Sequence, residues 1–355
     1  DANAAALALT ARNAASNGVV TVRVLSLQIQ LYKSSLVAFH LHARLAVTSW
    51  VCAATIPSIQ SLLTSHDYAF VPATEMQELL STEFGGVHDE DMTTLATMWD
   101  QATPQIDEQG MAVYPYKGTF VSYYRLKAGH VHRSSSHDWP KTHILNTTAS
   151  HVVEHIDPTT ADDSVSHFRL HRQWPPAMDN NSVVLAMQRL MFRLAQDPSL
   201  QLDKSHQHLG EETPLISSPF EAMMTAYRVT KCQVGVCRDG DPGPEGIHQD
   251  AAELTAVVLF GRRNVAALSG GNRVWSLEQP FGKPSEADTT SGRLLASLVM
   301  RERFDTLLVR DRRVKHEALP IVSADATGDA VRDVWTFEVR LPRDAPPDGT
   351  SCTES

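Results

Sequence analysis

One stretch decides how this chain is interpreted: Gly246-Ile247-His248-Gln249-Asp250-Ala251-Ala252-Glu253-Leu254-Thr255. His248 and Asp250 are two positions apart, and side chains on an extended strand alternate, so both would project to the same side. A histidine and a carboxylate so placed are two of the three ligands of a 2-His-1-carboxylate facial triad. Such a triad holds Fe(II) on one face and leaves the other coordination positions open.

The composition is that of a folded globular protein. The chain has 355 residues, 42% of them hydrophobic and 20% charged, which is enough for a sizeable core in one large domain. The formal net charge of −10 argues against a nucleic-acid or anionic-membrane partner. The four scattered cysteines form no CxxC pair, so we expect no zinc ribbon and no disulfide framework, and a reducing, cytoplasmic compartment.

Changes in amino-acid composition along the sequence divide the chain into three parts. Residues 1–57 are Ala-rich and then apolar, with four basic residues and a single acid. They are predicted to be an extension, and a targeting segment and a folded part of the domain both stay open. His40, His42 and Arg44 interrupt the longer apolar run, so no membrane span is predicted there. Residues 58–345 are expected to form a single domain, and residues 346–355 a tail.

Helices are expected in the first part of the domain. The strongest is Ser182–Gln196, whose apolar stripe includes Val183, Leu190 and Leu194 and which Asn180 or Asn181 could cap. Shorter helices are predicted at 59–63, 76–80 and 89–101, with strands at 68–71 and 119–126. Residues 130–160 are polar and histidine-rich without a clear period, which indicates a loop with room for one strand.

After Pro219 the pattern changes to short β-like runs separated by turn residues. The predicted strands are 226–236, 254–260, 273–277, 306–309 and 331–340. Short strands spaced by turn clusters favour an antiparallel sandwich or barrel over βαβ units.

A third ligand and an anchor for an anionic cosubstrate are both available. His316 is the only histidine after His248, and it follows the predicted strand at 306–309. Arg332 opens the last predicted strand, where a buried arginine could hold a distal carboxylate bidentately, better than a lysine could. Each feature alone is common on protein surfaces, and only their joint order points to a metal site.

With these residues in place, the chain resembles the 2OG-Fe dioxygenase family of free-amino-acid oxygenases, the isoleucine 4-hydroxylase type. The resemblance runs from about Ala226 to Leu341, and weaker similarity reaches back through Tyr123-Tyr124-Arg125 to about Ser65. Six stretches carry it: Cys232-Gln233, Ile247-His248-Gln249-Asp250, Ala267-Leu268-Ser269-Gly270-Gly271-Asn272, Asp305-Thr306-Leu307-Leu308-Val309, Val314-Lys315-His316-Glu317-Ala318-Leu319-Pro320 and Arg332-Asp333-Val334.

The resemblance implies a fold and a cofactor set. The fold would be α+β and mainly β: a double-stranded β-helix, a jelly-roll barrel with its core at about 220–341 and helices packed on one sheet. His248, Asp250 and His316 would ligate Fe(II), and Arg332 would bind the C5 carboxylate of 2-oxoglutarate. The implied reaction uses O2 to hydroxylate an unactivated C–H bond of a free L-amino acid, and it converts 2-oxoglutarate into succinate and CO2.

The substrate side leaves alternatives open. A free amino acid needs a cationic partner for its carboxylate, and Arg125 is the candidate, with Tyr124 or Gln233 nearby; Arg125 could equally be a structural ion pair. Oxidative ring closure of aziridine type on a valine-like amino acid is the alternative outcome within the family. The expected partner is a small amino acid, with no nucleic acid and no membrane, and a homodimer stays open.

Two other classes of protein compete with the oxygenase interpretation. A non-catalytic β-barrel binding module would share the short strands, but it predicts no iron binding and no succinate. A zinc hydrolase would need a general base near its bound water. Glu253 is the only acid close enough in sequence, and on a strand it would face away from His248 and Asp250.

Overall fold

The computed structural model describes most of the predicted domain. It covers residues 54–102, 104–106, 112–127, 130–133, 151–155, 168–200, 221–231, 240, 242, 246–250, 252–282, 292–325 and 328–340. The extension predicted for 1–57 lies almost wholly outside these residues, and the tail predicted for 346–355 lies wholly outside them. In the described part of the chain, no helix is both long enough and apolar enough to cross a membrane.

The structure describes four α-helices at the predicted places: α2 (Ile56–His66), α3 (Ala73–Phe84), α4 (Asp89–Asp100) and α5 (Ser182–Ala195). Two short 3-10 helices, η2 (Pro176–Asn180) and η3 (Pro198–Leu200), flank α5. Asn181 caps α5, because its Oδ1 accepts the backbone N–H of Val183 at 3.1 Å and of Val184 at 3.2 Å.

The strands form one large and one small sheet. The large sheet has the order β1 (Tyr68–Val71), β11 (Thr306–Val309), β8 (Leu254–Arg263), β13 (Ala330–Arg340), β7 (Glu221–Lys231), β3 (Ala112–Lys127), β2 (Pro104–Ile106), β6 (Phe168–Gln173), β5 (His151–His155), and β4 (His130–Arg133) pairs with β3. The small sheet has the order β10 (Leu294–Leu298), β9 (Asn272–Trp275), β12 (Lys315–Ala318). An antiparallel bridge between His248 and His316 adds the segment 246–248 beside β12.

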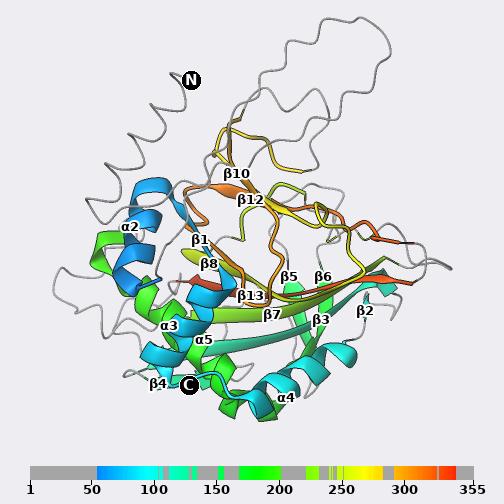
Figure 1. Ribbon diagram of the computed structural model, residues 1–355, viewed down its shortest axis with the longest axis horizontal. Helices are drawn as coiled ribbons and strands as arrows, with labels where there is room; N and C mark the ends of the chain where they lie inside the picture. Colours follow the sequence, from blue (N-terminus) through cyan, green and yellow to red (C-terminus); the bar gives the residue numbers. More distant parts are fainter. Residues whose placement is uncertain are drawn as a thin grey trace, which may run out of the picture.

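The two faces of the large sheet bury different layers. Along β13, Trp335, Phe337 and Val339 belong to the same buried cluster as the apolar stripe of α5. Side chains of the opposite face pack against the small sheet, and Val334 joins a cluster that includes Val274 of β9. Figure 1 shows α3, α4 and α5 on one side of β7 and β3, with β10 and β12 on the other. The protein is therefore a double-stranded β-helix with helices on one sheet, and this confirms the predicted fold.

Several strands were not predicted from the sequence. The residues of β12, Lys-His-Glu-Ala, have a polar composition that is usual for a turn, yet they pair residue by residue with β9. Strands β4 and β5 lie in the stretch expected to be mostly loop. Strands β12 and β5 pair with the more distant strands β9 and β6, whereas β4 forms a hairpin with the neighbouring β3. In each case the pairing determines the strand rather than local propensity.

The buried cluster between the helices and the large sheet, here called the helix-side core, gives a stability prediction. Leu190 on α5 is fully buried in this core, so Leu190→Ala removes buried contacts and leaves a cavity. We expect a loss of about 2–5 kcal/mol in the free energy of unfolding, measured by urea denaturation. Arg193→Ala on the exposed side of the same helix is the matched control and should change stability little. Equal effects of the two substitutions would contradict the assigned packing face of α5.

Candidate active site

The three residues of the predicted triad lie together. His248, Asp250 and His316 each offer a ligand atom, and these atoms all lie within 4.8 Å of one another. Nε2 of His248 is 3.4 Å from Oδ1 of Asp250, and Nε2 of His316 is 3.3 Å from Oδ2. Two imidazole nitrogens thus face one carboxylate, and this donor set can hold a divalent metal ion on one face.

Backbone pairing brings the two histidines together. The N–H of His248 donates to the carbonyl of His316 at 2.9 Å, and the N–H of His316 donates back at 3.0 Å. Gly246 has φ +61°, the left-handed region that favours glycine. Its carbonyl lies 2.9 Å from Nδ1 of His248, which orients the ring so that Nε2 faces Asp250.

A buried carboxylate that the sequence did not single out connects the two ligand-bearing segments. Asp311 is 0% exposed, and its Oδ1 lies 3.2 Å from Nδ1 of His316. Its Oδ2 accepts the backbone N–H of Ala252 at 3.3 Å, and its carbonyl accepts Nε2 of Gln249 at 2.5 Å. Gln249 lies between the two ligands His248 and Asp250, so its side chain fastens their segment to the turn before His316.

The electrostatics of the cluster favour a positive charge at its centre. Burial opposes a charge on His316, yet the carboxylates of Asp250 and Asp311 raise the pKa of its imidazole to about 10. Burial also opposes ionisation of Asp250, yet His316 and His248 hold the pKa of this carboxyl well below its ordinary value. A divalent cation would take the place of the imidazole proton, so metal binding is expected to release protons.

Arg332 lies on β13 with its side chain almost completely buried, at 1% exposure. Within the described residues, its Nε and Nη2 atoms have no hydrogen-bond partner. Burial and the neighbouring Arg262 lower the pKa of Arg332 to about 9. An unpaired buried guanidinium is costly, and a carboxylate bound bidentately would satisfy it. These free donors fit the distal carboxylate of 2-oxoglutarate.

Gly270, shortly before β9, leaves room for the side chain of Arg332. Gly270 has φ +62°, and a Cβ on it would lie 2.6 Å from Cγ2 of Ile321 and 3.4 Å from Cδ of Arg332. Any larger residue would push against the arginine stem and strain the backbone.

The two predicted substrate residues that the structure describes, Tyr124 and Arg125, are not brought together. Tyr124 and Arg125 are neighbours on β3, so they project to opposite faces of the sheet. Tyr124 belongs to the helix-side core, where its hydroxyl donates to Oδ1 of Asp179 at 3.0 Å. The inclusion of Tyr124 in the substrate site is therefore wrong, because it faces away from the small sheet and the triad. Gln233 lies outside the described residues.

Arg125 occupies a different position. In register, Arg125 of β3 and Arg340 of β13 both pair with position 221 of β7, so they share one face of the large sheet. Arg340 reaches the triad segment, because its Nη2 donates to the carbonyl of Asp250 at 3.0 Å. Arg125 thus lies on the face that carries the triad.

Glu253 does not offer a base to the triad. Its carboxylate is buried, and its Oε1 accepts Nε of Arg312 at 2.5 Å. The side chain is engaged by the turn that carries Arg312, as expected for a residue facing away from His248 and Asp250. The arrangement gives no support to a zinc hydrolase that would use Glu253 to activate water.

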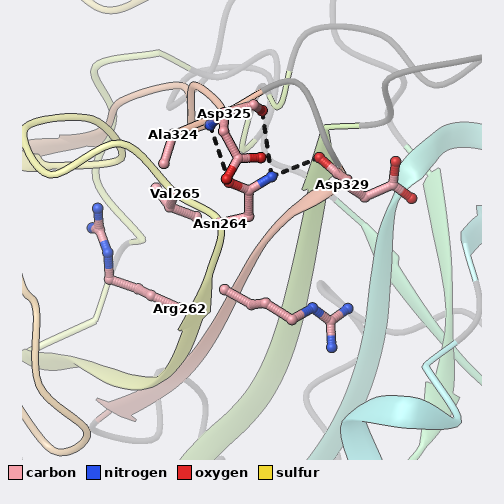
Figure 2. A pocket seen from close by; sticks show the side chains of 8 residues that line it. Arg262, Asn264, Val265, Ala324, Asp325 and Asp329 are labelled. Carbon is pink, nitrogen blue, oxygen red and sulfur yellow. Dashed lines mark hydrogen bonds between the residues drawn. The ribbon is translucent and has the colours of Figure 1, made fainter.

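A hollow of about 680 Å³ lies at the other end of β8. Figure 2 shows Asn264 at its centre: its Nδ2 donates to the carbonyl of Gly328 at 2.7 Å, and its Oδ1 accepts the N–H of Asp325 at 3.1 Å. The lining residues include none of the triad. The bonds of Asn264 fasten the loop between β12 and β13, which joins His316 to Arg332.

Asp311 gives a second prediction. Asp311→Ala removes the carboxylate beside Nδ1 of His316 and should weaken Fe(II) affinity by about 10- to 100-fold, as for other groups that orient a metal-bound histidine. The affinity is measured by anaerobic titration of the metal-free protein. Asp305→Asn, another buried acid, whose carboxylate accepts backbone N–H groups of Ala73 and Arg301, controls for a general loss of stability. Unchanged affinity in Asp311→Ala would show that the contact does not orient His316.

Comparison with known proteins places the site in a known kind of domain. Residues 186–338 match the model of the 2OG-Fe dioxygenase family, and this segment contains His248, Asp250, His316 and Arg332. Over 105 residues the chain is 29% identical to the bifunctional enzyme flvA of Aspergillus flavus. That match covers 29% of this chain and only 12% of the much longer flvA protein.

Solved structures agree in fold. The Fe(II)/α-ketoglutarate-dependent dioxygenase TqaL matches with a TM-score of 0.54 at 17% identity, covering 82% of this chain and 88% of TqaL. A bsmA homologue from Methylobium petroleophilum PM1 matches with a TM-score of 0.54 at 16% identity, covering 83% of this chain and 96% of its own. At such low identity these likenesses concern the arrangement of the strands, and they support the double-stranded β-helix.

Proposed function

We propose that this chain, a 2-oxoglutarate-dependent non-haem iron dioxygenase, hydroxylates an unactivated C–H bond of a free L-amino acid. The enzyme class and its cofactors, Fe(II), 2-oxoglutarate and O2, follow from the family of residues 186–338 and from the histidine–aspartate–histidine cluster that they contain. One observation carries the assignment of the site: the triad atoms lie within 4.8 Å of one another in a domain that also buries Arg332, whose Nε and Nη2 have no hydrogen-bond partner among the described residues.

Each residue then has a defined role in the proposal. His248, Asp250 and His316 ligate Fe(II), and Asp311 keeps the imidazole of His316 in place. Arg332 binds the C5 carboxylate of 2-oxoglutarate. When bound, the metal and its cosubstrate supply the oxidation of a C–H bond by O2, with succinate and CO2 as products. The protein supplies the positions of the groups and excludes competing reactions.

The barrel interior is suited to exclude water. Between the two sheets, the face of the large sheet that packs on the small sheet is lined by buried aliphatic side chains, among them Val257, Leu259, Leu307 and Val334. An apolar wall beside the triad limits the entry of water and keeps a reactive site dry.

A free amino acid as substrate is supported by charges on this same face. Arg125 and Arg340 share it in register, and Glu338 is bonded to Arg340. We propose Arg125 as the partner of the substrate carboxylate. A small buried cluster of Val121, Tyr123 and Met223 lies on the same strands and favours an aliphatic side chain of the isoleucine or valine type.

Product analysis tests the proposed function. The protein is incubated with Fe(II), 2-oxoglutarate, O2 and each of the common L-amino acids, and succinate and product masses are measured. We expect succinate to rise with one or a few aliphatic amino acids, whose mass increases by one oxygen atom. Loss of two hydrogens instead would indicate ring closure. If folded, iron-loaded protein forms no amino-acid-dependent succinate, the proposed substrate class is wrong.

A further inference from the structure

The barrel interior contains a charged pair at the end of β13. Glu338 and Arg340 are two positions apart, so both face the interior, and Glu338 is only 3% exposed. Nη2 of Arg340 donates to Oε2 of Glu338 at 2.6 Å and to the carbonyl of Asp250 at 3.0 Å. This charged pair therefore lies directly beside the backbone of a proposed metal ligand.

Several buried polar atoms on the face of the sheet that carries this pair have no hydrogen-bond partner among the described residues. Thr255 pairs with Glu338 in register across β8 and β13, and its buried Oγ1 has no hydrogen-bond partner among the described residues. The same is true of Oγ1 of Thr225 on β7 and of Nε of Arg340. A buried polar group without a partner is unfavourable, so these atoms on the interior face of the large sheet indicate a site for a polar molecule.

The charge of the pair limits what that molecule can be. Arg125 on the same face is the proposed partner of the substrate carboxylate, and Glu338 supplies the opposite charge for an ammonium group of the same molecule, so a zwitterion matches these charges better than a simple amine or a simple carboxylate. Arg340 contacts one oxygen of Glu338, and a carboxylate can accept about four hydrogen bonds. The carboxylate of Glu338 can therefore accept the N–H groups of an ammonium ion as well.

Apolar neighbours complete the site. In register, Glu338 pairs with Met223 on β7, which pairs in turn with Tyr123 on β3. Both belong to the small buried cluster that also contains Val121. Across β13, β7 and β3, the carboxylate of Glu338 is therefore followed by the side chains of Met223 and Tyr123.

We propose that Glu338 binds the α-ammonium group of an aliphatic L-amino acid. The proposal rests on the proposed function and adds a specificity-determining residue to it. Arg340 is the positioning residue, because it holds the carboxylate of Glu338 against the segment of Asp250. The cluster of Val121, Tyr123 and Met223 receives the aliphatic side chain.

The test compares an amino acid with its analogue that lacks the amino group. Under anaerobic conditions, L-valine and 3-methylbutanoate are titrated into protein loaded with Fe(II) and 2-oxoglutarate, and the change in the visible charge-transfer band gives each Kd. We expect the wild type to bind L-valine more tightly, by at least about 30-fold for a charge-assisted ammonium contact. In Glu338→Gln this preference should fall at least about tenfold.

Asp333→Asn is the matched control, because it removes a buried carboxylate from the other face of the same strand, where Arg228 is the partner. It should keep the preference for L-valine. If Glu338→Gln keeps the wild-type preference for L-valine, the proposal is overturned. A wild type that binds L-valine and 3-methylbutanoate equally well also overturns it, and this comparison does not depend on the folding of any variant. A wild type that forms no band with Fe(II) and 2-oxoglutarate would instead contradict the proposed function itself.

Discussion

Asp250→Ala should abolish iron-dependent turnover while the protein stays folded. Oδ1 and Oδ2 of Asp250 lie 3.4 Å and 3.3 Å from the Nε2 atoms of His248 and His316, so the substitution leaves only two neutral donors for the metal. We expect succinate formation to fall by more than about 100-fold, beyond the loss caused by groups that only orient a ligand. Succinate is measured at saturating 2-oxoglutarate and amino acid.

Folding of Asp250→Ala is checked separately by circular dichroism and urea denaturation. Asp305→Asn again serves as a control, since it changes a buried acid that accepts backbone N–H groups away from the triad. It should retain turnover wherever it stays folded. Turnover that survives in Asp250→Ala would refute the assignment of this carboxylate as a ligand.

Arg332→Met should separate cosubstrate binding from stability. The guanidinium is buried, and its Nε and Nη2 have no partner among the described residues, so without 2-oxoglutarate it is an uncompensated buried charge. Replacement by methionine should leave the unfolding temperature of the cosubstrate-free protein unchanged or higher. Affinity for 2-oxoglutarate should fall by about 30-fold or more, the cost of removing one partner of a buried ion pair.

Thermal unfolding with and without 2-oxoglutarate, both with Fe(II), measures both effects. The wild type should gain stability as 2-oxoglutarate binds, and Arg332→Met should gain little at the same concentration. Arg228→Met is the matched control on the neighbouring strand. Arg228 donates to Asp333 at 2.7 Å and to Asp100 at 2.9 Å, so its loss should lower the unfolding temperature. An Arg332→Met protein that keeps the full 2-oxoglutarate response would contradict the assigned role.

Local patterns predicted the short antiparallel strands and the candidate ligands, whereas the double-stranded β-helix and the complete ligand set were implied by the resemblance to the dioxygenase family. Short apolar runs between turn residues indicated the strands, and the spacing of His248 and Asp250 is meaningful on any extended segment. His316 was harder, since β12 is polar. Its strand exists because β9 and the segment 246–248 pair with it, and a sequence does not display such partners.

The substrate side could not be predicted in the same way. Residues 118–124 of β3 are buried on both faces, so the run Tyr123-Tyr124-Arg125 does not reveal which face meets the barrel interior, and Tyr124 was placed on the wrong one. Along β13, Arg332, Val334, Thr336, Glu338 and Arg340 share a face. Such a polar alternation normally indicates solvent. These charged side chains lie inside the barrel because the small sheet packs on this face of β13, and the sequence of β13 alone does not reveal that packing.

Asp311 was missed for a related reason. It stands in the run Asp311-Arg312-Arg313, and a charged run between two strands is usually a solvated turn. In the fold this turn closes over the triad, so the carboxylate is buried against His316 while Arg312 bonds Glu253. Burial of one residue in a charged turn is a tertiary property.

The most direct test of the central claim is anaerobic addition of Fe(II) and then 2-oxoglutarate to the purified protein. If the triad holds the metal and Arg332 anchors the cosubstrate, a weak visible charge-transfer band should appear in the wild type and saturate with 2-oxoglutarate. The band should be absent in Asp250→Ala and should require much more 2-oxoglutarate in Arg332→Met. A well-folded wild type without this band would contradict the account.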